Sequence, residues 1–581
     1  MCGIFTILNN ESHSNTFIQD QFDKGQHRGP EFSILKDYGI KIKMGFHRLA
    51  INGLNSASNQ PFLFNDVILI CNGEIYNYKT LYARMGVEPT TDSDCEVIYH
   101  LYVRYGIEQA IQMLDGVFSF ILFDQNSLGE SSYLYIARDP YGVRPLYTMK
   151  GNRGHLLGFA SELKMLDKFA DTTITQFRPG TYSKYELTSK VMAYWRPLIT
   201  QAPFHNIGFE EFSYNDNYVK VENSETKILP QIAARLTNAV YKRCMTTERP
   251  IACLLSGGLD SSLITALVCQ YARSANHGNG QVIETYSIGL ADSEDLRYAR
   301  MVADHLNTRH TEIVLTEYDF ISAISQVIYD IESYDTTTVR ASIGNYLLGK
   351  YISENSQAKV IFNGDGSDEL TGGYLYMTRA PDAVEFDRET RRLLKDIHLY
   401  DVLRSDKSIS SHGLEPRTPF LDRSFVQYYM SIPADIRFHV KSEGNVLQEK
   451  SLIRRAFHGG GLLPDKVLFR RKEAFSDGVS KTTRSLYEII GEWTDEWFET
   501  AYGLTPTTEN IESVFYKTYS RQAVNPSKTS EQFYYRILFE AAYPGRGDIV
   551  PYFWMPKYVN ATDASARTLT LYDNTEGGWS D

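Results

Sequence analysis

Short apolar or alternating segments, separated by Gly, Asn and Asp, dominate the first 195 residues of the chain. Such segments are typical of strands in stacked sheets, and clear examples occur at residues 4–8, 67–71, 117–123 and 133–137. Helical runs at residues 94–105 and 107–114 interrupt them. The pattern predicts an α+β domain over residues 2–195, with stacked antiparallel sheets flanked by helices.

The pattern changes in the second part of the chain. Residues 200–227 are polar and lack periodicity, which predicts a linker. After it, helices at 228–243, 262–272 and 296–306 alternate with apolar strands at 251–255, 283–288 and 359–362. Strands separated by helices predict an α/β domain over residues 228–581, with a parallel sheet, helices on both faces and a helical part after about residue 400.

Composition narrows the function classes. The net charge of −12 and the absence of a basic run argue against a nucleic-acid partner, although a local cation cluster could still bind a small anion. No apolar stretch reaches 18 residues, so no membrane span is expected. The 6 cysteines show neither disulfide nor zinc spacing, and no secretory leader pattern precedes them. We therefore expect a cytoplasmic protein.

The first candidate for chemistry is Cys2, directly after the initiator Met. Removal of Met1 would give a residue with both a thiol and a free α-amine, and an amine with a pKa near ~8 can act as the base for its own nucleophile. A cysteine at this position is by itself more often incidental, so the neighbouring motifs decide its role.

Five motifs follow in a fixed order: HRGP at 27–30, HRLAI at 47–51, NGEIYN at 72–77, SDCE at 93–96 and RDPYGVRPLY at 138–147. Together with Cys2 they resemble the class II glutamine amidotransferase domain, whose nucleophile is the N-terminal residue. The resemblance covers residues 2–195.

This resemblance implies a glutamine site around Cys2. Asn72 and Gly73 would stabilise the oxyanion, Arg48 would grip the α-carboxylate of glutamine, and Asp94 with Glu74 would accept its α-ammonium. A surface ion pair between Arg48 and Asp94 is the alternative. His27, His47 and the segment 138–147 are assigned structural roles. The remaining expected glutamine contacts are Leu49, Ala50, Ile51 and Asn52.

The second candidate is a loop between an apolar strand and an amphipathic helix, with the sequence SGGLDSS at 256–262. Its glycines would let the backbone approach an anion at the helix N-terminus, and a carboxylate beside phosphates needs a cation such as Mg²⁺ between them. The loop resembles that of ATP pyrophosphatases rather than a Walker A loop, and a simple helix-capping turn is the alternative. The expected ATP contacts here are Ser256, Gly257, Gly258, Asp260, Ser261 and Ser262.

Two further segments complete this second site. In the turn after the strand at 359–362, Asp365, Asp368 and Glu369 lie close in sequence, and Asp368 is expected to bind Mg²⁺ opposite Asp260. In the segment 331–342, Thr337 and Arg340 are candidates for holding the carboxylate of an amino-acid substrate.

These segments, together with GLEPRTPFLD at 413–422, Glu449-Lys450 and RKEAFSDGV at 471–479, resemble glutamine-hydrolysing asparagine synthetase almost from end to end. The resemblance implies that ATP, aspartate and glutamine are the substrates, with Mg²⁺ bound alongside ATP. It also implies that Lys450 acts on the phosphates and Asp365 as a base. Expected adenosine contacts are Leu254, Ile288, Asn363 and Gly364.

The chain departs from the family pattern at five positions, one of which is Asn363 in place of the usual Ser. Asp365 stands where a Glu is usual, which leaves its role as a base open; Glu31 replaces an Asp, and Asn52-Gly53 replaces Val-Asp. Another amide-forming ligase and a non-catalytic scaffold or nitrogen-status regulator are the competing interpretations. The sequence leaves the oligomeric state open, with a homodimer as one option.

Overall fold

The structure is a computed structural model of the chain. It describes every residue except 10–12, 40, 126–130, 153, 189–193, 208–224, 275–279, 440–447, 474, 481–483, 521, 566–567 and 569–581. Residues 208–224, most of the predicted linker, therefore lie outside the described residues. Of the rest of that segment, residues 200–203 end a strand and residues 225–227 begin a helix.

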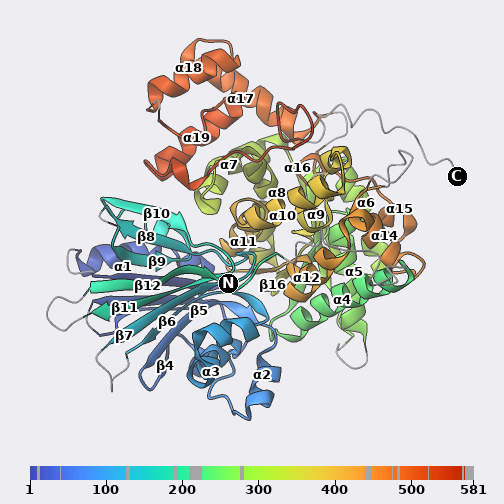
Figure 1. The fold of residues 1–581 in the computed structure, drawn as a ribbon. Helices are drawn as coiled ribbons and strands as arrows, with labels where there is room; N and C mark the ends of the chain where they lie inside the picture. The colour runs from blue at the N-terminus through green and yellow to red at the C-terminus, as the bar shows by residue number, and fades with distance from the viewer. Residues whose placement is uncertain are drawn as a thin grey trace.

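Two antiparallel sheets of six strands each form the N-terminal domain, at the lower left of Figure 1. The first has the order β10 (Thr172–Gln176), β8 (Tyr147–Gly151), β9 (Leu156–Ala160), β1 (Gly3–Leu8), β3 (Ile42–Arg48) and β2 (Phe32–Asp37). The second has the order β12 (Tyr194–Pro203), β11 (Thr181–Thr188), β7 (Ser132–Arg138), β6 (Gly116–Asp124), β5 (Val67–Ile75) and β4 (Phe62–Phe64).

Alternation along the strands explains the layers of this domain. In β1, Ile4 and Leu8 face the second sheet, whereas Phe5 and Ile7 face the opposite side, because successive strand side chains point to opposite faces. Helix α1 (Asn15–Asp23) covers the outer face of the first sheet; α2 (Tyr78–Met85) and α3 (Val97–Met113) cover that of the second. The predicted α+β domain is confirmed.

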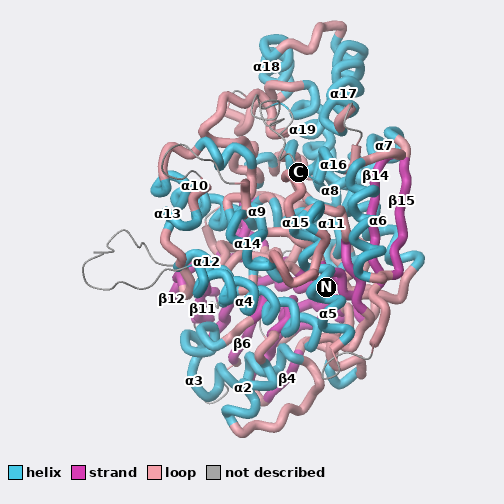
Figure 2. The backbone as a smooth tube through the Cα atoms, turned by 90° about the vertical axis from the view of Figure 1, so that its right-hand side faces the viewer, coloured by secondary structure: helices cyan, strands magenta, loops and turns pink. Residues whose placement is uncertain are grey.

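A parallel sheet of five strands organises the second domain: β15 (Arg309–Leu315), β14 (Glu284–Leu290), β13 (Ile251–Leu254), β16 (Val360–Phe362) and β17 (Glu415–Arg417). Figure 2 shows the edge strand β15 and its neighbour β14 side by side. Ala252 and Cys253, adjacent in β13, belong to different hydrophobic clusters, so both faces of this strand are buried against helices. The predicted α/β domain is confirmed.

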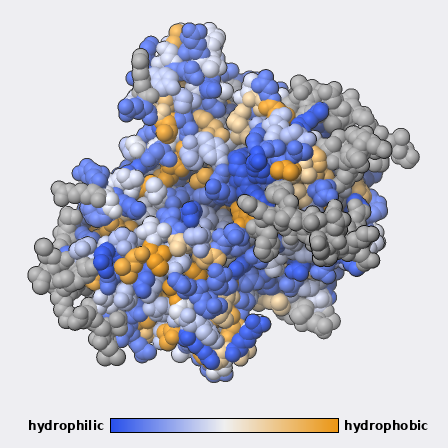
Figure 3. All heavy atoms as spheres, viewed as in Figure 1, coloured by the Kyte–Doolittle hydropathy of each residue, from blue (hydrophilic) through white to orange (hydrophobic). Residues whose placement is uncertain are grey.

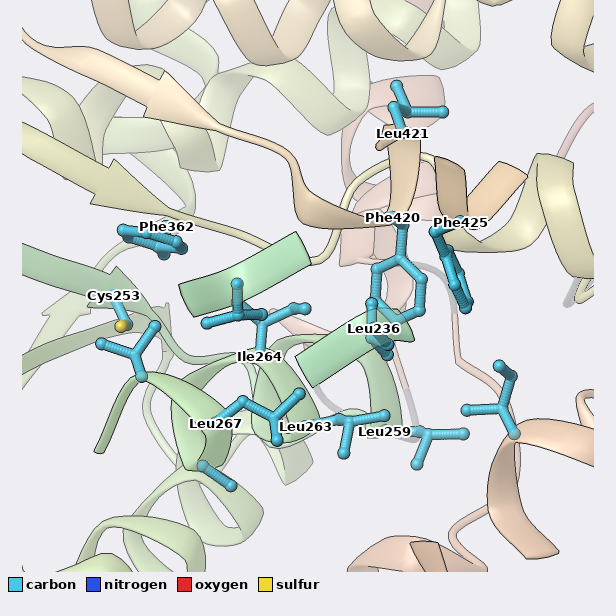
Figure 4. Close-up of a cluster of buried hydrophobic side chains, with 14 of the residues drawn as sticks. Leu236, Cys253, Leu259, Leu263, Ile264, Leu267, Phe362, Phe420, Leu421 and Phe425 are labelled. Atoms are coloured by element: carbon cyan, nitrogen blue, oxygen red, sulfur yellow. The ribbon is translucent and has the colours of Figure 1, made fainter. Parts of the chain in front are cut away.

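One of these clusters packs α4 and α5 against the sheet. Figure 4 shows Leu263 and Ile264 of α5 between Leu236 of α4, Cys253 of β13 and other apolar side chains. The helices of the second domain are α4 (Glu225–Met245), α5 (Leu259–Arg273), α6 (Glu294–Leu306), α7 (Glu317–Ile331), α8 (Thr336–Asn355), α9 (Ser367–Thr371), α10 (Ala383–Asp396), α11 (Asp401–Ser410), α12 (Arg423–Ser431), α13 (Ala434–Arg437), α14 (Ser451–Phe457), α15 (Asp465–Leu468), α16 (Phe475–Gly478), α17 (Leu486–Tyr502), α18 (Thr508–Thr518) and α19 (Ser530–Ala542).

Helices α17, α18 and α19 project from the rest of the molecule at the top of Figure 1. The visible face in Figure 3 is mostly hydrophilic, with apolar side chains in small groups. Among the described residues, no helix has both the length and the apolar character needed to cross a membrane.

Buried ion pairs connect the two domains. Arg28 bonds to Glu162 of its own domain at 3.0 Å and to Asp406 of α11 at 2.8 Å, and Arg144 bonds to the same Asp406 at 3.3 Å. Both arginines are fully buried. Because a buried charge is costly unless it is paired, these contacts favour one docked arrangement of the domains over others.

Candidate functional site

Cys2 directly precedes β1, and the N-terminus marked in Figure 1 lies close to the junction of the two domains. Its backbone N–H donates to Asn72 Oδ1 at 3.2 Å, and its Sγ lies 3.7 Å from the carbonyl oxygen of Leu49. Arg28 Nε donates to the Cys2 carbonyl at 3.0 Å. Burial raises the pKa of the Cys2 thiol, so this thiol needs a base before it can act as a nucleophile.

Asn72 is oriented by this contact with Cys2. Since Asn72 Oδ1 accepts from the Cys2 N–H, the amide nitrogen Nδ2 faces elsewhere, and it has no hydrogen-bond partner among the residues that the structure describes. A buried donor left without a partner is costly unless a ligand satisfies it. Gly73 follows on β5, where a Cβ would lie 2.3 Å from the Val117 carbonyl oxygen. The geometry fits the predicted role of Asn72 in an oxyanion site.

Arg48 ends β3, and its guanidinium is held by neutral groups. Its Nη1 donates to the Asn55 carbonyl at 2.9 Å and to Asn59 Oδ1 at 2.6 Å, and its Nη2 donates to the carbonyls of Asn52 and Gly53. It forms no ion pair with any residue that the structure describes, so the surface ion pair with Asp94 is not formed. Arg48 is 7% exposed. A buried cation of this kind can receive the carboxylate of a ligand.

Asp94 and Glu74 lie beside each other in this site. Asn52 Nδ2 donates to Glu74 Oε2 at 2.7 Å and to Asp94 Oδ1 at 3.5 Å, and Asp94 Oδ2 accepts from the Ile75 N–H at 2.6 Å. Burial raises the pKa of Asp94 to about 6. Burial and the Asp94 carboxylate raise the pKa of Glu74. A donor at position 52 therefore suits this chain better than the usual apolar Val, because it stabilises two neighbouring acceptors.

The residues assigned structural roles are structural here. The His47 ring stacks on Phe22 with centroids 3.8 Å apart, and burial lowers its pKa to about 4. Arg138 is fully buried and donates to the carbonyls of Arg144 and Gly142 at 2.8 and 2.9 Å. The segment 138–147 therefore shapes a turn, as predicted.

A pocket in the second domain lies at the carboxyl ends of β13, β14 and β16, where parallel sheets commonly bind ligands. It collects predicted residues from five separate segments of the chain. Those that line it are Leu254, Ser256, Gly258, Asp260, Ser261, Ile288, Thr337, Asn363, Gly364, Asp365, Asp368 and Lys450.

The loop at 256–262 is closed on itself and packed against the turn after β16. Ser261 Oγ accepts from the Ser256 N–H at 3.1 Å and lies 2.9 Å from Ser256 Oγ. A Cβ on Gly364 would lie 2.7 Å from Asp260 Cβ, so only glycine allows the two segments to approach this closely. Helix α5 begins at Leu259 and directs its N-terminus at the pocket, which makes the site suitable for an anion.

A buried lysine, a partly buried lysine and two carboxylates meet in this pocket. Lys450 Nζ lies 2.5 Å from Asp260 Oδ2 and 2.6 Å from Asp368 Oδ1, and Lys472 Nζ lies 2.8 Å from Asp368 Oδ2. Burial alone would raise the pKa of Asp368, but the two ammonium groups outweigh it and hold the pKa well below its usual value. Lys450 has a φ of +60°, a strained conformation that is typical of functional sites.

The donor set fits a magnesium ion that arrives with a nucleotide. Asp260 and Asp368 already converge on one cation, the Lys450 ammonium. The described residues contain no group of three or more His, Cys, Asp or Glu that could hold a metal by themselves. Phosphate oxygens and waters would therefore have to complete the octahedral shell of Mg²⁺.

Asp365 faces the same pocket, supported by Arg404 of α11. Arg404 Nη2 lies 3.2 Å from Asp365 Oδ1, and it also bonds to Asp401. Asp365 Oδ2 is buried without a hydrogen-bond partner among the described residues. The shorter acid therefore still directs a free oxygen into the pocket, although its role as a base stays a prediction.

Arg340 is not in the pocket, and the structure does not support the expectation that it binds a substrate carboxylate. Its Nε bonds to Glu531 at 2.7 Å and its Nη1 to Asp563 at 2.7 Å. Two carboxylates already neutralise this guanidinium, which is 3% exposed. Thr337 does line the pocket, and its Oγ1 is buried without a partner in the described part of the chain.

Gly257 and Ser262 also lie beside the pocket rather than in its lining. Gly257 packs against the backbone of Tyr298 and Ala299 on α6, and Ser262 is fully buried within α5. Both residues support the conformation of the loop without lining the pocket. The opposite wall comes from far along the chain: Trp554 lines the pocket, and its backbone N–H donates to Asp335 Oδ1 at 2.7 Å.

Sequence reasoning missed several charged residues of these sites, and three of them contact predicted residues directly. Lys472 and Arg404 line the nucleotide pocket, and Arg417 of β17 lies 3.2 Å from Glu74 in the glutamine site. Lys472 falls within the quoted motif at 471–479, so its position beside a phosphate loop could have been suspected. No local pattern marks Arg404 or Arg417, because their partners lie far away in the sequence.

Two protein families match this chain, one over each of its two domains. Residues 1–193 match the family described as "Glutamine amidotransferase domain", and residues 231–385 and 378–542 match "Asparagine synthase". Among solved structures, an NMN synthetase from Francisella tularensis covers 55% of this chain and 95% of its own, with 13% identity and a TM-score of only 0.25.

Curated relatives match along the whole chain. The glutamine-hydrolyzing asparagine synthetase of Gallus gallus is 38% identical over 595 residues, which cover 98% of this chain and 99% of the relative. That of Rattus norvegicus is 37% identical over 603 residues, which cover 99% and 100%. On this evidence the chain belongs to the family of glutamine-hydrolysing asparagine synthetases, which are ATP-dependent ligases.

Proposed function

We propose that this chain makes asparagine from aspartate, with glutamine as the nitrogen donor and ATP as the source of energy. The products are asparagine, glutamate, AMP and diphosphate. The names of the relatives and both family matches support this overall reaction. The observation that carries it is a pair of sites with complementary chemistry. One has a nucleophilic sulfur beside an unpaired amide donor, and the other is a pocket with clustered charges beside a helix N-terminus.

In the glutamine half, Cys2 is the nucleophile. Once Met1 is removed, its α-amine takes the thiol proton, and the thiolate attacks the side-chain amide carbon of glutamine. The Asn72 amide and the Gly73 backbone N–H stabilise the oxyanion. The C–N bond then breaks, ammonia leaves with the transferred proton, and water hydrolyses the thioester to glutamate. Arg48 holds the α-carboxylate of glutamine, while Asp94 and Glu74 accept its α-ammonium.

In the synthetase half, the side-chain carboxylate of aspartate attacks the α-phosphorus of ATP and diphosphate leaves. The product, a β-aspartyl-adenylate, has a leaving group that a carboxylate lacks. Lys450 and Lys472 neutralise phosphate charge, Thr337 is placed to donate to the aspartate, and Asp365 takes a proton from the attacking ammonia. Asp260 and Asp368 would hold Mg²⁺, which neutralises phosphate oxygens when bound with ATP.

Ammonia passes between the sites inside the protein. In neutral water most ammonia is ammonium, which has no lone pair for attack. Arg417 supports a short internal route because it touches both sites: its guanidinium lies 3.2 Å from Glu74, and its carbonyl accepts from the Asn363 N–H at 3.2 Å. An ammonia scavenger should therefore suppress ammonia-dependent synthesis much more than glutamine-dependent synthesis. Equal suppression would contradict the route.

A direct test uses purified protein whose N-terminus is shown by mass spectrometry to begin at Cys2. With Mg²⁺, ATP, aspartate and an ammonium salt, it should release AMP, diphosphate and asparagine in equal amounts. Other amino acids in place of aspartate should release little diphosphate. If such protein formed no AMP with aspartate, the proposed function would be wrong and the scaffold interpretation would gain support.

A further inference from the structure

The loop at 246–250, which joins α4 to β13 in the second domain, lies directly against the glutamine site of the first domain. Arg249 Nε donates to the Ala50 carbonyl at 2.8 Å, and the Glu248 N–H donates to the Ile51 carbonyl at 3.0 Å. Glu248 Oε1 accepts from the Gly53 N–H at 2.7 Å. Three residues of the segment 49–53 thus have their backbone held by another domain.

Glu31, one of the departures from the family pattern, completes this contact. Its Oε2 accepts from the Ala50 N–H at 2.7 Å, and its Oε1 pairs with Arg249 Nη2 at 2.6 Å. Glu31 and Arg249 therefore hold the N–H and the carbonyl of the same residue, Ala50. The longer acid at position 31 has the reach to bond to the backbone and to the guanidinium together.

Gly53, another departure, ties the same segment to Arg48. Its φ of +61° is a conformation that favours glycine, and a Cβ there would lie 2.2 Å from Ser58 Oγ. Its N–H donates to Glu248 while its carbonyl accepts from Arg48 Nη2. The carbonyl of Asn52 accepts from the same guanidinium at 3.2 Å. A shift of this segment would move the acceptors that orient Arg48.

We propose that Arg249 and Glu248 are positioning residues for glutamine: the second domain sets the shape of the glutamine pocket by holding the segment 49–53. This inference rests on the proposed function, because it takes Arg48 and Asn52 as parts of that pocket. Neither residue touches the reacting atoms. They act through the Ala50, Ile51 and Gly53 backbone on the orientation of Arg48 and Asn52.

The contacts are suited to positioning rather than to stability. The side chains of Arg249 and Glu31 are 27% and 31% exposed. An ion pair with this degree of exposure contributes little to the free energy of unfolding. Variants at these positions should therefore fold. The pair of Arg300 and Glu312, on α6 and β15 away from the glutamine site, is the control. Its distance of 2.8 Å is similar, and with exposures of 47% and 29% it is also open to water.

The test compares Arg249→Ala, Arg249→Lys, Glu248→Ala, Glu248→Gln and Arg300→Ala in the full-length enzyme. Glutaminase activity and ammonia-dependent synthesis are measured separately. For Arg249→Ala and Glu248→Ala, KM for glutamine should rise about tenfold, the usual size of coupling between sites, while kcat changes less than about twofold. Arg249→Lys and Glu248→Gln keep a donor or an acceptor and should recover most of the loss. Ammonia-dependent synthesis and Arg300→Ala should match the wild type.

Three results would overturn the inference. One is an unchanged KM for glutamine in both alanine variants. Another is an equal loss of ammonia-dependent synthesis, which would indicate general damage. The third is an Arg300→Ala variant with the same rise in KM. A wild-type enzyme without glutaminase activity would instead contradict the proposed function, so the two failures are distinguishable.

Discussion

Arg48 in the glutamine site and Lys450 in the nucleotide site are both buried cations, but their partners differ in charge. Arg48 bonds to carbonyl and amide oxygens and forms no ion pair with a described residue. Lys450 contacts two carboxylates, Asp260 and Asp368. The first cation is therefore left with an unbalanced positive charge, whereas the second is already neutralised by the protein.

This difference teaches how each site receives its ligand. Glutamine brings a carboxylate that can pair with Arg48 directly, so the pocket needs no exchange of ions. ATP brings several negative charges to a pocket whose lysines are engaged, so binding must separate Lys450 and Lys472 from Asp260 and Asp368. On the proposed function, Asp260 and Asp368 would then hold Mg²⁺ in place of the lysines, which would make that exchange favourable.

The largest expected effect tests whether the two sites act independently. In Cys2→Ala, glutamine-dependent synthesis should fall by at least about 10,000-fold, because the nucleophile is gone, while ammonia-dependent synthesis stays near the wild-type rate. Asparagine formation is measured with each nitrogen source. Loss of both activities would show that the sites are not independent and that the role of Cys2 is mis-assigned.

Asp260→Asn tests the opposite site. Diphosphate release should fall about 1,000-fold, since the amide cannot replace a charged ligand beside phosphates, and glutaminase activity should persist. Glu312→Gln, a charge removal on the exposed side of β15, serves as the control. A glutaminase activity that fell as much as diphosphate release would contradict the separation.

Arg340→Ala tests whether this residue is structural. It removes the cation between Glu531 and Asp563, and leaving buried carboxylates unpaired should lower the free energy of unfolding by about 3 kcal/mol. Denaturant unfolding of the variant and of Arg300→Ala, where the loss should stay under about 1 kcal/mol, measures this. Unchanged stability with a strongly raised KM for aspartate would restore the role predicted from the sequence.

The smallest effect is a pH dependence of glutamine binding. Asp94, whose pKa burial raises to about 6, accepts an ammonium only when ionised, so binding is strong above that pH and weakens as pH falls through it. For Cys2→Ala, which removes the titrating thiol, Kd for glutamine at about pH 5 should be about tenfold above its value at about pH 7. Calorimetry measures it. Asp94→Asn should bind weakly at both values, and a wild-type-like pH dependence in that variant would exclude Asp94.

Much of this architecture is predictable because its signals are local. The strand, glycine turn and helix around 251–272 lie within one stretch of sequence, and the alternation in β1 predicts both sheet faces. The ion pairs of Arg340 are not predictable in this way, because its partners are 191 and 223 residues away, where no short motif reaches. The structural roles of Glu31 and Gly53 likewise cannot be predicted from local sequence, because their partners Arg249 and Glu248 lie in the loop at 246–250.

Trp554, close to the end of the chain, lines the nucleotide pocket, and this has a consequence for assembly during translation. The ribosome releases Cys2, Arg48 and Asn72 first, and the residues that hold their loop, Glu248 and Arg249, emerge later. The nucleotide pocket lacks a wall until the last part of the chain has been made. The pocket that the proposed function assigns to ATP is therefore completed only after the whole glutamine site has been synthesised.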